Sequence, residues 1–220
     1  MARLRSLIDA VTRERYVRDA ATGIAYRRTA GSLVWPSGER NGCVAVLAET
    51  RSRQNILGGR HDVHLLAEEC SADVSKLISA VEKFTMLLMV RSWATPLSDT
   101  RAFMLDDTND DRRKVRLPII RFDDPQGWHG KGEGLMAFYH ALVQRRTLSE
   151  KTLFLGKNCE GRNNIEKMQA EDMTCKPTDF PASAALCFAL AEIDLNPMTD
   201  WADRGNVSSY GGPADLIGGY

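Results

Sequence analysis

The sequence predicts an α/β protein with a mixed sheet of about five strands and helices on both faces. The apolar run Cys43–Glu49 has the composition of a strand that is covered on both faces. A longer segment, from about Ser71 to Trp93, repeats apolar residues at the spacing of an amphipathic helix. A second apolar run, Arg101–Leu105, follows and ends in Asp106 and Asp107. Because strand–helix–strand connections are right-handed crossovers, this second run is expected to lie parallel to an earlier strand.

The predicted α/β domain covers residues 41–195, and local patterns give its remaining elements. Residues 61–69 predict a strand by their alternation, and Ser71 is the predicted N-cap of the helix that follows. Further strands are expected at residues 116–122 and 152–155, and helices at residues 134–146 and 162–170. The last helix is expected from Asp179 to Ile193, with Pro181 in its first turn. Residues 196–220 are a glycine-rich tail.

Residues 1–40 are expected to form an arginine-rich helix and a linker. Over residues 1–20 the apolar side chains share one helical face, and they are Leu4, Leu7, Ile8 and Val11. Residues 21–41 contain several glycines and a proline, which predicts a linker with one short strand near Ser32–Trp35. The arginines favour a solvated face of a packed helix, because acidic residues dilute their charge. An arm that contacts phosphates is the alternative.

Composition and cysteine usage limit the classes of protein. The 220-residue chain has 29 basic and 29 acidic residues, so its overall charge gives no argument for nucleic-acid binding. Its five cysteines, without a Cys-x-x-Cys pair, indicate reduced thiols that fill the core in a cytoplasmic compartment. No cysteine or histidine pair has zinc-finger spacing, so no structural zinc site is expected. The start lacks the apolar core of a signal peptide, and no apolar run reaches the ~20 residues of a membrane span.

Two widespread enzyme motifs are missing from the sequence. There is no Gly-x-x-x-x-Gly-Lys-Ser/Thr loop, so the chain does not encode an ATP-binding motor of that type. The glycine-rich segment Gly127–Gly134 lacks this spacing and is expected to be a loop. No Gly-x-Ser-x-Gly elbow occurs either, and no cysteine lies in a recognisable nucleophile motif. Hydrolysis through a covalent intermediate therefore has no support.

Carboxylates at the ends of predicted elements are the candidate chemical groups. Glu49 closes the first predicted strand, Asp106 and Asp107 close the strand after the crossover, and Asp179 opens the last helix. If they converge at one edge of the sheet, their oxygens would bind hard cations such as Mg²⁺ or Mn²⁺. Two such ions can activate a water and stabilise the leaving oxygen of a phosphodiester. The alternative is that these residues only end strands and cap a helix.

This order of elements resembles the ribonuclease H-like nuclease fold and, more narrowly, the nuclease half of phage large terminase subunits. The segments that carry the resemblance are Val44–Glu49, His64–Glu69, Phe103–Asp107 and Asp179–Leu186. The resemblance implies metal-dependent cutting of double-stranded DNA during genome packaging. It implies that Glu49, Asp107 or Asp106, and Asp179 would be the metal ligands. The candidate DNA contacts are the basic residues Arg112, Arg113, Lys114, Arg145 and Arg146.

Three features depart from the family pattern. The first-strand acid is Glu49 where the family usually has Asp, and Asp179 lies more than one turn before the position of the usual helix acid. The ATPase half of a large terminase is absent from the sequence. The chain is therefore expected to be a separately encoded nuclease, or a non-catalytic phage structural or packaging-accessory protein on the same fold. The expected partners are double-stranded DNA and a packaging ATPase or portal or capsid proteins in the host cytoplasm, with no membrane.

Overall fold

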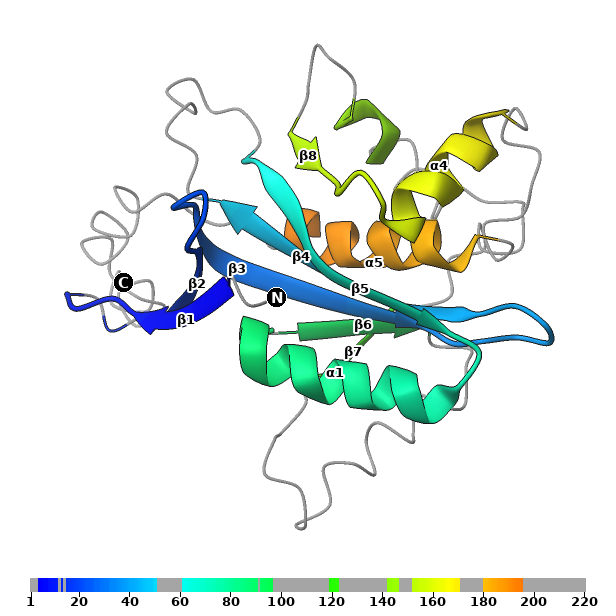
Figure 1. Ribbon diagram of the computed structural model, residues 1–220, viewed down its shortest axis with the longest axis horizontal. Coiled ribbons are helices and arrows are strands. Elements are labelled where there is room, and N and C mark those ends of the chain that lie inside the picture. The colour runs from blue at the N-terminus through cyan, green and yellow to red at the C-terminus, as the bar shows by residue number, and fades with distance from the viewer. Residues whose placement is uncertain are drawn as a thin grey trace, which may run out of the picture.

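The protein is an α/β structure whose mixed sheet lies between helices on both faces (Figure 1). The computed structural model describes residues 4–11, 13, 15–50, 61–90, 92–96, 119–122, 142–146, 152–170 and 180–195. Within these residues the sheet has eight strands, against the about five that the sequence predicts. The strands are β1 (Leu4–Ile8), β2 (Arg15–Asp19), β3 (Ala25–Val34), β4 (Gly42–Thr50), β5 (Val63–Ser71), β6 (Ser92–Pro96), β7 (Ile119–Phe122) and β8 (Leu153–Phe154). The helices are α1 (Val74–Leu88), α4 (Glu160–Ala170) and α5 (Pro181–Leu195).

The middle of the sheet has a ribonuclease H-like order. Strands β3, β4 and β5 form an antiparallel meander. Helix α1 then crosses one face, and β6 returns parallel to β3, with Gly31 opposite Trp93. Strand β7 extends the sheet in parallel beyond β6. The predicted crossover is thus confirmed, but its return strand is Ser92–Pro96; the segment expected to return, Arg101–Leu105, lies outside the described residues.

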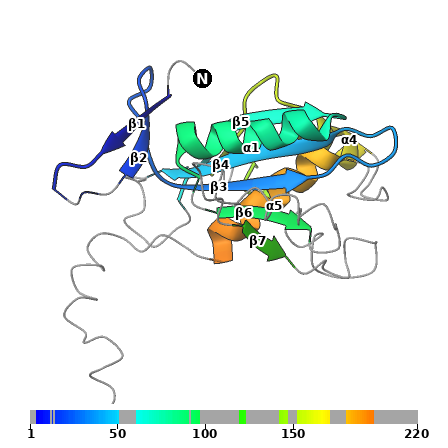
Figure 2. The same cartoon turned by 90° about the horizontal axis from the view of Figure 1, so that it is seen from below.

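The predicted helix over residues 1–20 is wrong, because this segment forms the β1–β2 hairpin (Figure 2). The Asp9 carboxylate accepts a hydrogen bond from the Val11 amide at 3.0 Å, and the Asp9 carbonyl accepts one from the Arg13 amide. Arg13 has a φ of 59°, which is left-handed backbone. Aspartate favours such turns because its side chain satisfies backbone amides locally and so competes with a helix. The apolar spacing of this segment therefore does not report a helical face.

The predicted linker over residues 21–41 is also wrong, because residues 25–34 form the ten-residue strand β3, of which only the end near Ser32–Trp35 was predicted as a strand. This strand has β4 on one side, and β2 followed by β6 on the other. Its Gly31, which looks like a breaker in the sequence, is needed for packing. A Cβ at position 31 would stand 2.5 Å from the Trp93 ring. The sheet domain consequently begins before residue 41.

Helix α1 confirms the predicted apolar stripe, although it is shorter than the predicted Ser71–Trp93. Leu77 and Val81 have no exposed surface. The N-cap is Asp73 and not Ser71, and the Asp73 carboxylate accepts a hydrogen bond from the Ser75 amide at 2.8 Å. The helix ends at Met89, whose φ of 50° turns the chain into left-handed backbone. This early end gives residues 92–96 to β6.

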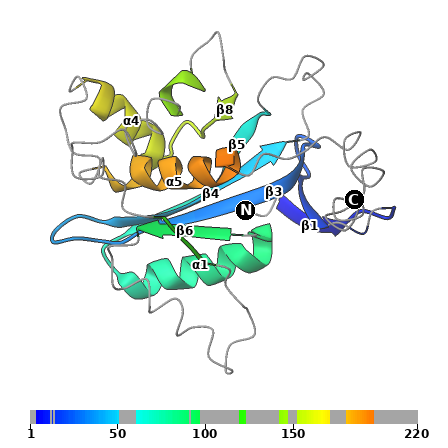
Figure 3. The ribbon, with the colours of Figure 1, turned by 180° about the vertical axis from the view of Figure 1, so that it is seen from behind.

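Two apolar cores lie on the two faces of the sheet (Figure 3). One core joins α1 to the sheet and contains Trp93. The other joins α5 to the sheet, with α4 packed beside it. Helix α5 is rich in alanine and apolar on all sides, as expected for a helix that is buried all round. The predicted last helix and the helix at residues 162–170 are confirmed within two residues at each end.

The other predicted elements match in part. The strand predicted at residues 61–69 is β5, the one at 152–155 is the short β8, and the one at 116–122 includes β7. Of the helix predicted at residues 134–146, only residues 142–146 are described, and 142–144 are helical. The tail from residue 196 lies outside the described residues. Among the described helices, none combines the length and the apolarity that a membrane crossing requires.

Candidate functional site

Glu49 is the one predicted metal ligand among the described residues. It lies near the end of β4, is 4% exposed, and stands in register with Arg28 of β3. Residues Cys43, Ala45 and Leu47 of the same strand belong to the core beneath α5, so strand alternation places Glu49 on that face too. Asp106, Asp107 and Asp179 lie outside the described residues. Convergence of the four carboxylates therefore stays a prediction.

A cluster of polar side chains contacts the last turns of α5, on the face of the sheet where Glu49 lies. The Arg28 guanidinium donates to the backbone carbonyls of Glu192 at 2.6 Å and Ile193 at 3.2 Å. The Glu192 carboxylate is 3.9 Å from the same guanidinium and accepts the Ser92 hydroxyl at 3.0 Å. Since the final carbonyls of a helix lack partners within the helix, Arg28 caps α5. These contacts tie the end of α5 to β3 and β6.

The two central parallel strands carry no carboxylate. Strand β3 reads AYRRTAGSLV and β6 reads SWATP. In the ribonuclease H-like order, β3 takes the place of the first strand, which the family pattern provides with an acid. Glu49 instead lies on the second strand of the meander. On β3, Ser32 faces α5 and donates its hydroxyl to the Ala185 carbonyl at 2.5 Å.

The predicted DNA contacts fall in two places. Arg112, Arg113 and Lys114 lie outside the described residues. Arg145 is 3% exposed, and its backbone carbonyl accepts the amides of residues 152 and 153. Arg146 pairs with Glu166 at 3.4 Å. To contact a phosphate, Arg145 would have to become exposed and Arg146 would have to leave Glu166. These DNA contacts therefore stay predictions.

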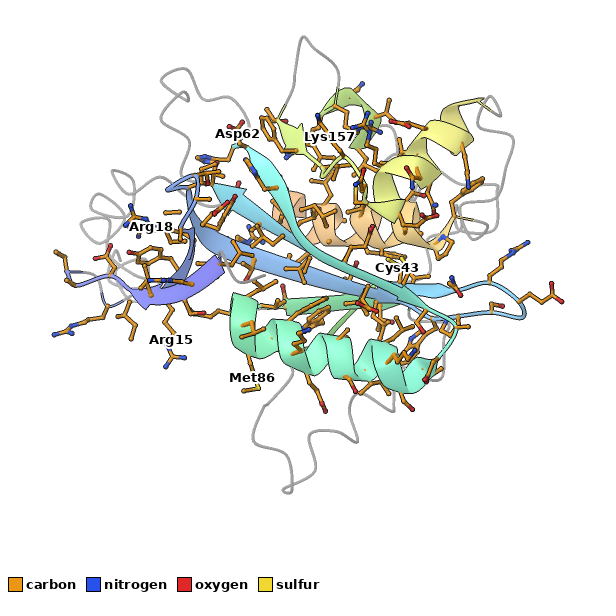
Figure 4. The ribbon with its side chains drawn as sticks, in the orientation of Figure 1. Arg15, Arg18, Cys43, Asp62, Met86 and Lys157 are labelled. Atoms are coloured by element: carbon orange, nitrogen blue, oxygen red, sulfur yellow. The ribbon has the colours of Figure 1, made fainter. Side chains whose placement is uncertain are left out.

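A basic surface lies on the β1–β2 hairpin, from which Arg15 and Arg18 project (Figure 4). It belongs to the arginine-rich segment for which an arm that contacts phosphates is the alternative interpretation. Arg5 and Arg18 are directly opposite each other across the two strands, and both are exposed. Neither forms an ion pair within the described part of the chain. Like charges in directly opposed positions destabilise a strand pair. An anion bound between them would offset that repulsion.

Three further side chains form a cluster that could hold a metal ion, namely Cys43 of β4 with Glu68 and Cys70 of β5. One ligand atom from each lies within 4.8 Å of the others. The two sulfurs are 3.0 Å apart, and both cysteines are free thiols. Burial, with a smaller contribution from Cys70, raises the pKa of the Cys43 thiol well above its ordinary value. Two of the three donors are soft sulfur atoms, so the cluster gives no indication of a Mg²⁺ or Mn²⁺ site.

Glu68 in this cluster also caps helix α4. Its two carboxylate oxygens accept the backbone amides of Glu160 at 2.6 Å and Gly161 at 2.7 Å. Burial raises the pKa of Glu68, the two amides act in the opposite direction, and the nearby Glu160 carboxylate raises it further. The local pattern Glu-x-Cys on one strand was visible in the sequence. The partner Cys43 was not, because only the β4–β5 register places it opposite Cys70.

No protein-family model matches the chain, and no curated protein matches it. The functional interpretation therefore depends on the sheet order and on the residues described above.

Proposed function

We propose that the chain is a metal-dependent endonuclease that cuts double-stranded DNA in phage genome packaging, like the nuclease half of a large terminase subunit. The observation that supports this proposal is the order of the sheet. An antiparallel meander, a crossover helix and a strand that returns beside the first are the arrangement of the family that the sequence resembles. Fold alone does not define a function, so the site residues must carry the test.

The proposed ions are Mg²⁺ or Mn²⁺, held by Glu49, Asp106, Asp107 and Asp179. Carboxylate oxygens are hard donors and suit these cations. Glu49 fits this role in one respect, since it is a carboxylate with only 4% exposure beside a sheet end. When bound, the ions would activate a water and stabilise the leaving oxygen of the phosphodiester.

The proposed DNA contacts comprise the predicted basic residues and the hairpin surface. Arg5 and Arg18 occupy directly opposed positions on the two strands, and neither has an ion-pair partner among the described residues. Guanidinium groups bind phosphate through paired hydrogen bonds. Because the formal charge of the whole chain is zero, we expect binding through few phosphate contacts. A packaging ATPase or a portal or capsid protein is the proposed protein partner, in the host cytoplasm.

One observation favours a second candidate function, a non-catalytic structural or packaging-accessory protein on the same fold. It is the lack of any carboxylate on β3 and β6, the two central parallel strands. A chain with this fold and without the acids would still present the hairpin surface for DNA or for a protein.

Cleavage of DNA by the purified chain in Mn²⁺, with and without chelator, separates the two functions. Three variants test the site, and these are Glu49→Gln, Asp107→Asn and Asp179→Asn. Each is expected to abolish cleavage, because each removes a charged metal ligand. Glu69→Gln is the matched control. Glu69 is exposed on β5, so this variant should cut like the parent.

Circular dichroism of each variant confirms that the fold persists. If the parent cuts and all three variants cut equally well, the assigned ligands are wrong. If the parent binds DNA and never cuts it, the second candidate function replaces the first.

A further inference from the structure

We propose that Cys43, Glu68 and Cys70 bind one zinc ion. This site is separate from the proposed nuclease site, which would use hard carboxylate ligands and a different kind of ion. It would also overturn the expectation, drawn from the spacing of cysteines and histidines, that the chain has no structural zinc site. Thiolate ligands select soft or borderline ions, and zinc in proteins is bound by cysteine sulfur, histidine nitrogen and carboxylate oxygen.

The two cysteines are presented by the sheet itself. Cys43 and Cys70 are direct cross-strand partners in the antiparallel β4–β5 pair. Both contact the core on the α5 face, so their side chains share one side of the sheet. Tetrahedral zinc with Zn–S bonds near 2.3 Å needs sulfurs about 3.8 Å apart, so the present 3.0 Å must open by about 0.8 Å. A rotation of the more exposed Cys70 side chain would supply that change.

Glu68 supplies the third ligand in a fixed orientation. Its position two residues before Cys70 places both side chains on the same side of β5. The amides of Glu160 and Gly161 hold its two oxygens at 2.6 and 2.7 Å, and each oxygen keeps a further lone pair for a metal. Such outer hydrogen bonds are the usual means by which a protein orients a metal ligand. Gly161 permits this approach, because a Cβ there would stand 2.9 Å from the Glu68 oxygen.

The local charges suit a divalent ion. Two thiolates and one carboxylate carry more negative charge than a single zinc ion neutralises. The amino-terminal end of α4, whose amides contact Glu68, supplies compensating partial positive charge. Zinc binds cysteine as the thiolate, so binding would release one proton from each of the two free thiols.

An opening to solvent reaches the site beside Cys70. A cavity of about 450 Å³ is lined by Cys70, Glu160 and Asn164, with Arg40 and Lys167 among its other lining residues. This cavity gives the ion an entry path. It also leaves room for a water or a small anion as the fourth ligand, the arrangement of zinc sites with three protein ligands.

The test is metal titration of the full-length chain, first freed of metal by a chelator and kept reduced with a phosphine. Zn²⁺ binding is measured by equilibrium dialysis, and Co²⁺ is the spectroscopic probe. We expect one ion per chain and a Co²⁺ spectrum with intense thiolate-to-cobalt absorption. Cys70→Ser should weaken zinc binding by about 100-fold or more, since even the loss of an outer-sphere partner costs about 10- to 100-fold.

Cys159→Ser is the matched control. Cys159 is a nearby half-buried thiol outside the cluster, and serine suits its place before α4. Its zinc affinity should equal that of the parent. Protection of Cys70 from alkylation by Zn²⁺ in the parent chain, read by peptide mapping, gives a second measurement that needs no variant.

Three results would overturn the zinc proposal. The first is no zinc uptake by the reduced chain at micromolar concentration. The second is Co²⁺ bound without thiolate absorption, or bound equally by the Cys70→Ser variant. The third is a Cys43–Cys70 disulfide that forms in air, combined with no metal binding after reduction. None of these results depends on DNA cleavage, so the zinc proposal and the nuclease proposal can fail separately.

Discussion

The contact between Gly31 and Trp93 is the packing feature that places β6 beside β3. A Cβ at position 31 would lie 2.5, 2.6 and 2.8 Å from three atoms of the indole. Carbon atoms prefer about 3.5–4.0 Å, so Gly31→Ala creates an overlap of about 1 Å. The ring is 1% exposed, and its Nε1–H donates to the Thr85 hydroxyl at 2.8 Å, so it has little freedom to move away.

In a strand, alanine is normally more stable than glycine by about 0.5–1 kcal/mol. We expect the overpacking to outweigh this gain and to lower the free energy of unfolding by about 1–3 kcal/mol net. For a chain of this length, the melting temperature of Gly31→Ala should fall by about 2–12 °C. Trp93→Ala alone should cost about 3–5 kcal/mol. In the Trp93→Ala background the added methyl group has room, and Gly31→Ala should cost almost nothing.

Urea unfolding followed by circular dichroism measures the four proteins of this double-mutant cycle. The expected coupling free energy is about 1–3 kcal/mol. Gly156→Ala is the control, because a Cβ at Gly156 meets no atom within 4 Å, and it should be neutral. If the costs of Gly31→Ala and Trp93→Ala add without coupling, β6 does not pack beside β3 and the ribonuclease H-like order is refuted.

Three further predictions follow from α1, from the aromatic cluster and from the hairpin. Leu77→Ala should destabilise the protein by about 2–5 kcal/mol and Lys76→Ala by less than about 0.5 kcal/mol; equal thermal shifts would show that α1 is not a core helix. Burial between rings lowers the pKa of His64, so its stabilising contribution is present above the unfolded pKa of 6.5 and lost as pH falls. The melting temperature of His64→Phe should therefore fall less than that of the parent between pH 7.5 and 5.5. An equal fall in both proteins would contradict this assignment. Arg5→Ala and Arg18→Ala should each weaken DNA binding and reduce the salt slope by about one, and an unchanged slope would exclude the hairpin as a DNA contact.

Local patterns were sufficient to predict the elements with an uninterrupted apolar signal. Strand β4 is apolar from Cys43 to Ala48, α1 repeats apolar residues at helical spacing, and α5 is apolar over most of its length. Strands β1 and β2 were missed, and of β3 only the end near Ser32–Val34 was predicted, for physical reasons. The apolar residues of the β1–β2 hairpin also fit a helical spacing, and only the Asp9 turn decides against a helix. Gly31 resembles a linker residue until Trp93, sixty-two positions later, is known to pack on it.

This error changed which strand was taken as the first of the sheet. With Cys43–Glu49 as the first strand, Glu49 took the position of the family's first-strand acid, which is usually Asp. With β3 in that place, the acid is missing from the matching strand. The strand register also explains why the sulfur cluster was not predicted. Cys43 and Cys70 are twenty-seven residues apart, and nothing local in the sequence fixes the pairing of β4 with β5 across the connection at residues 51–62.

The measurement that tests the proposed function most directly is a time course of plasmid DNA with the parent chain in Mn²⁺, Mg²⁺ or Zn²⁺. The proposal predicts that supercoiled plasmid becomes linear with Mn²⁺ or Mg²⁺, that chelator stops the conversion, and that Zn²⁺ alone does not support it. Supercoiled plasmid that stays intact in Mn²⁺ at excess protein, while the chain is folded, would contradict the nuclease proposal.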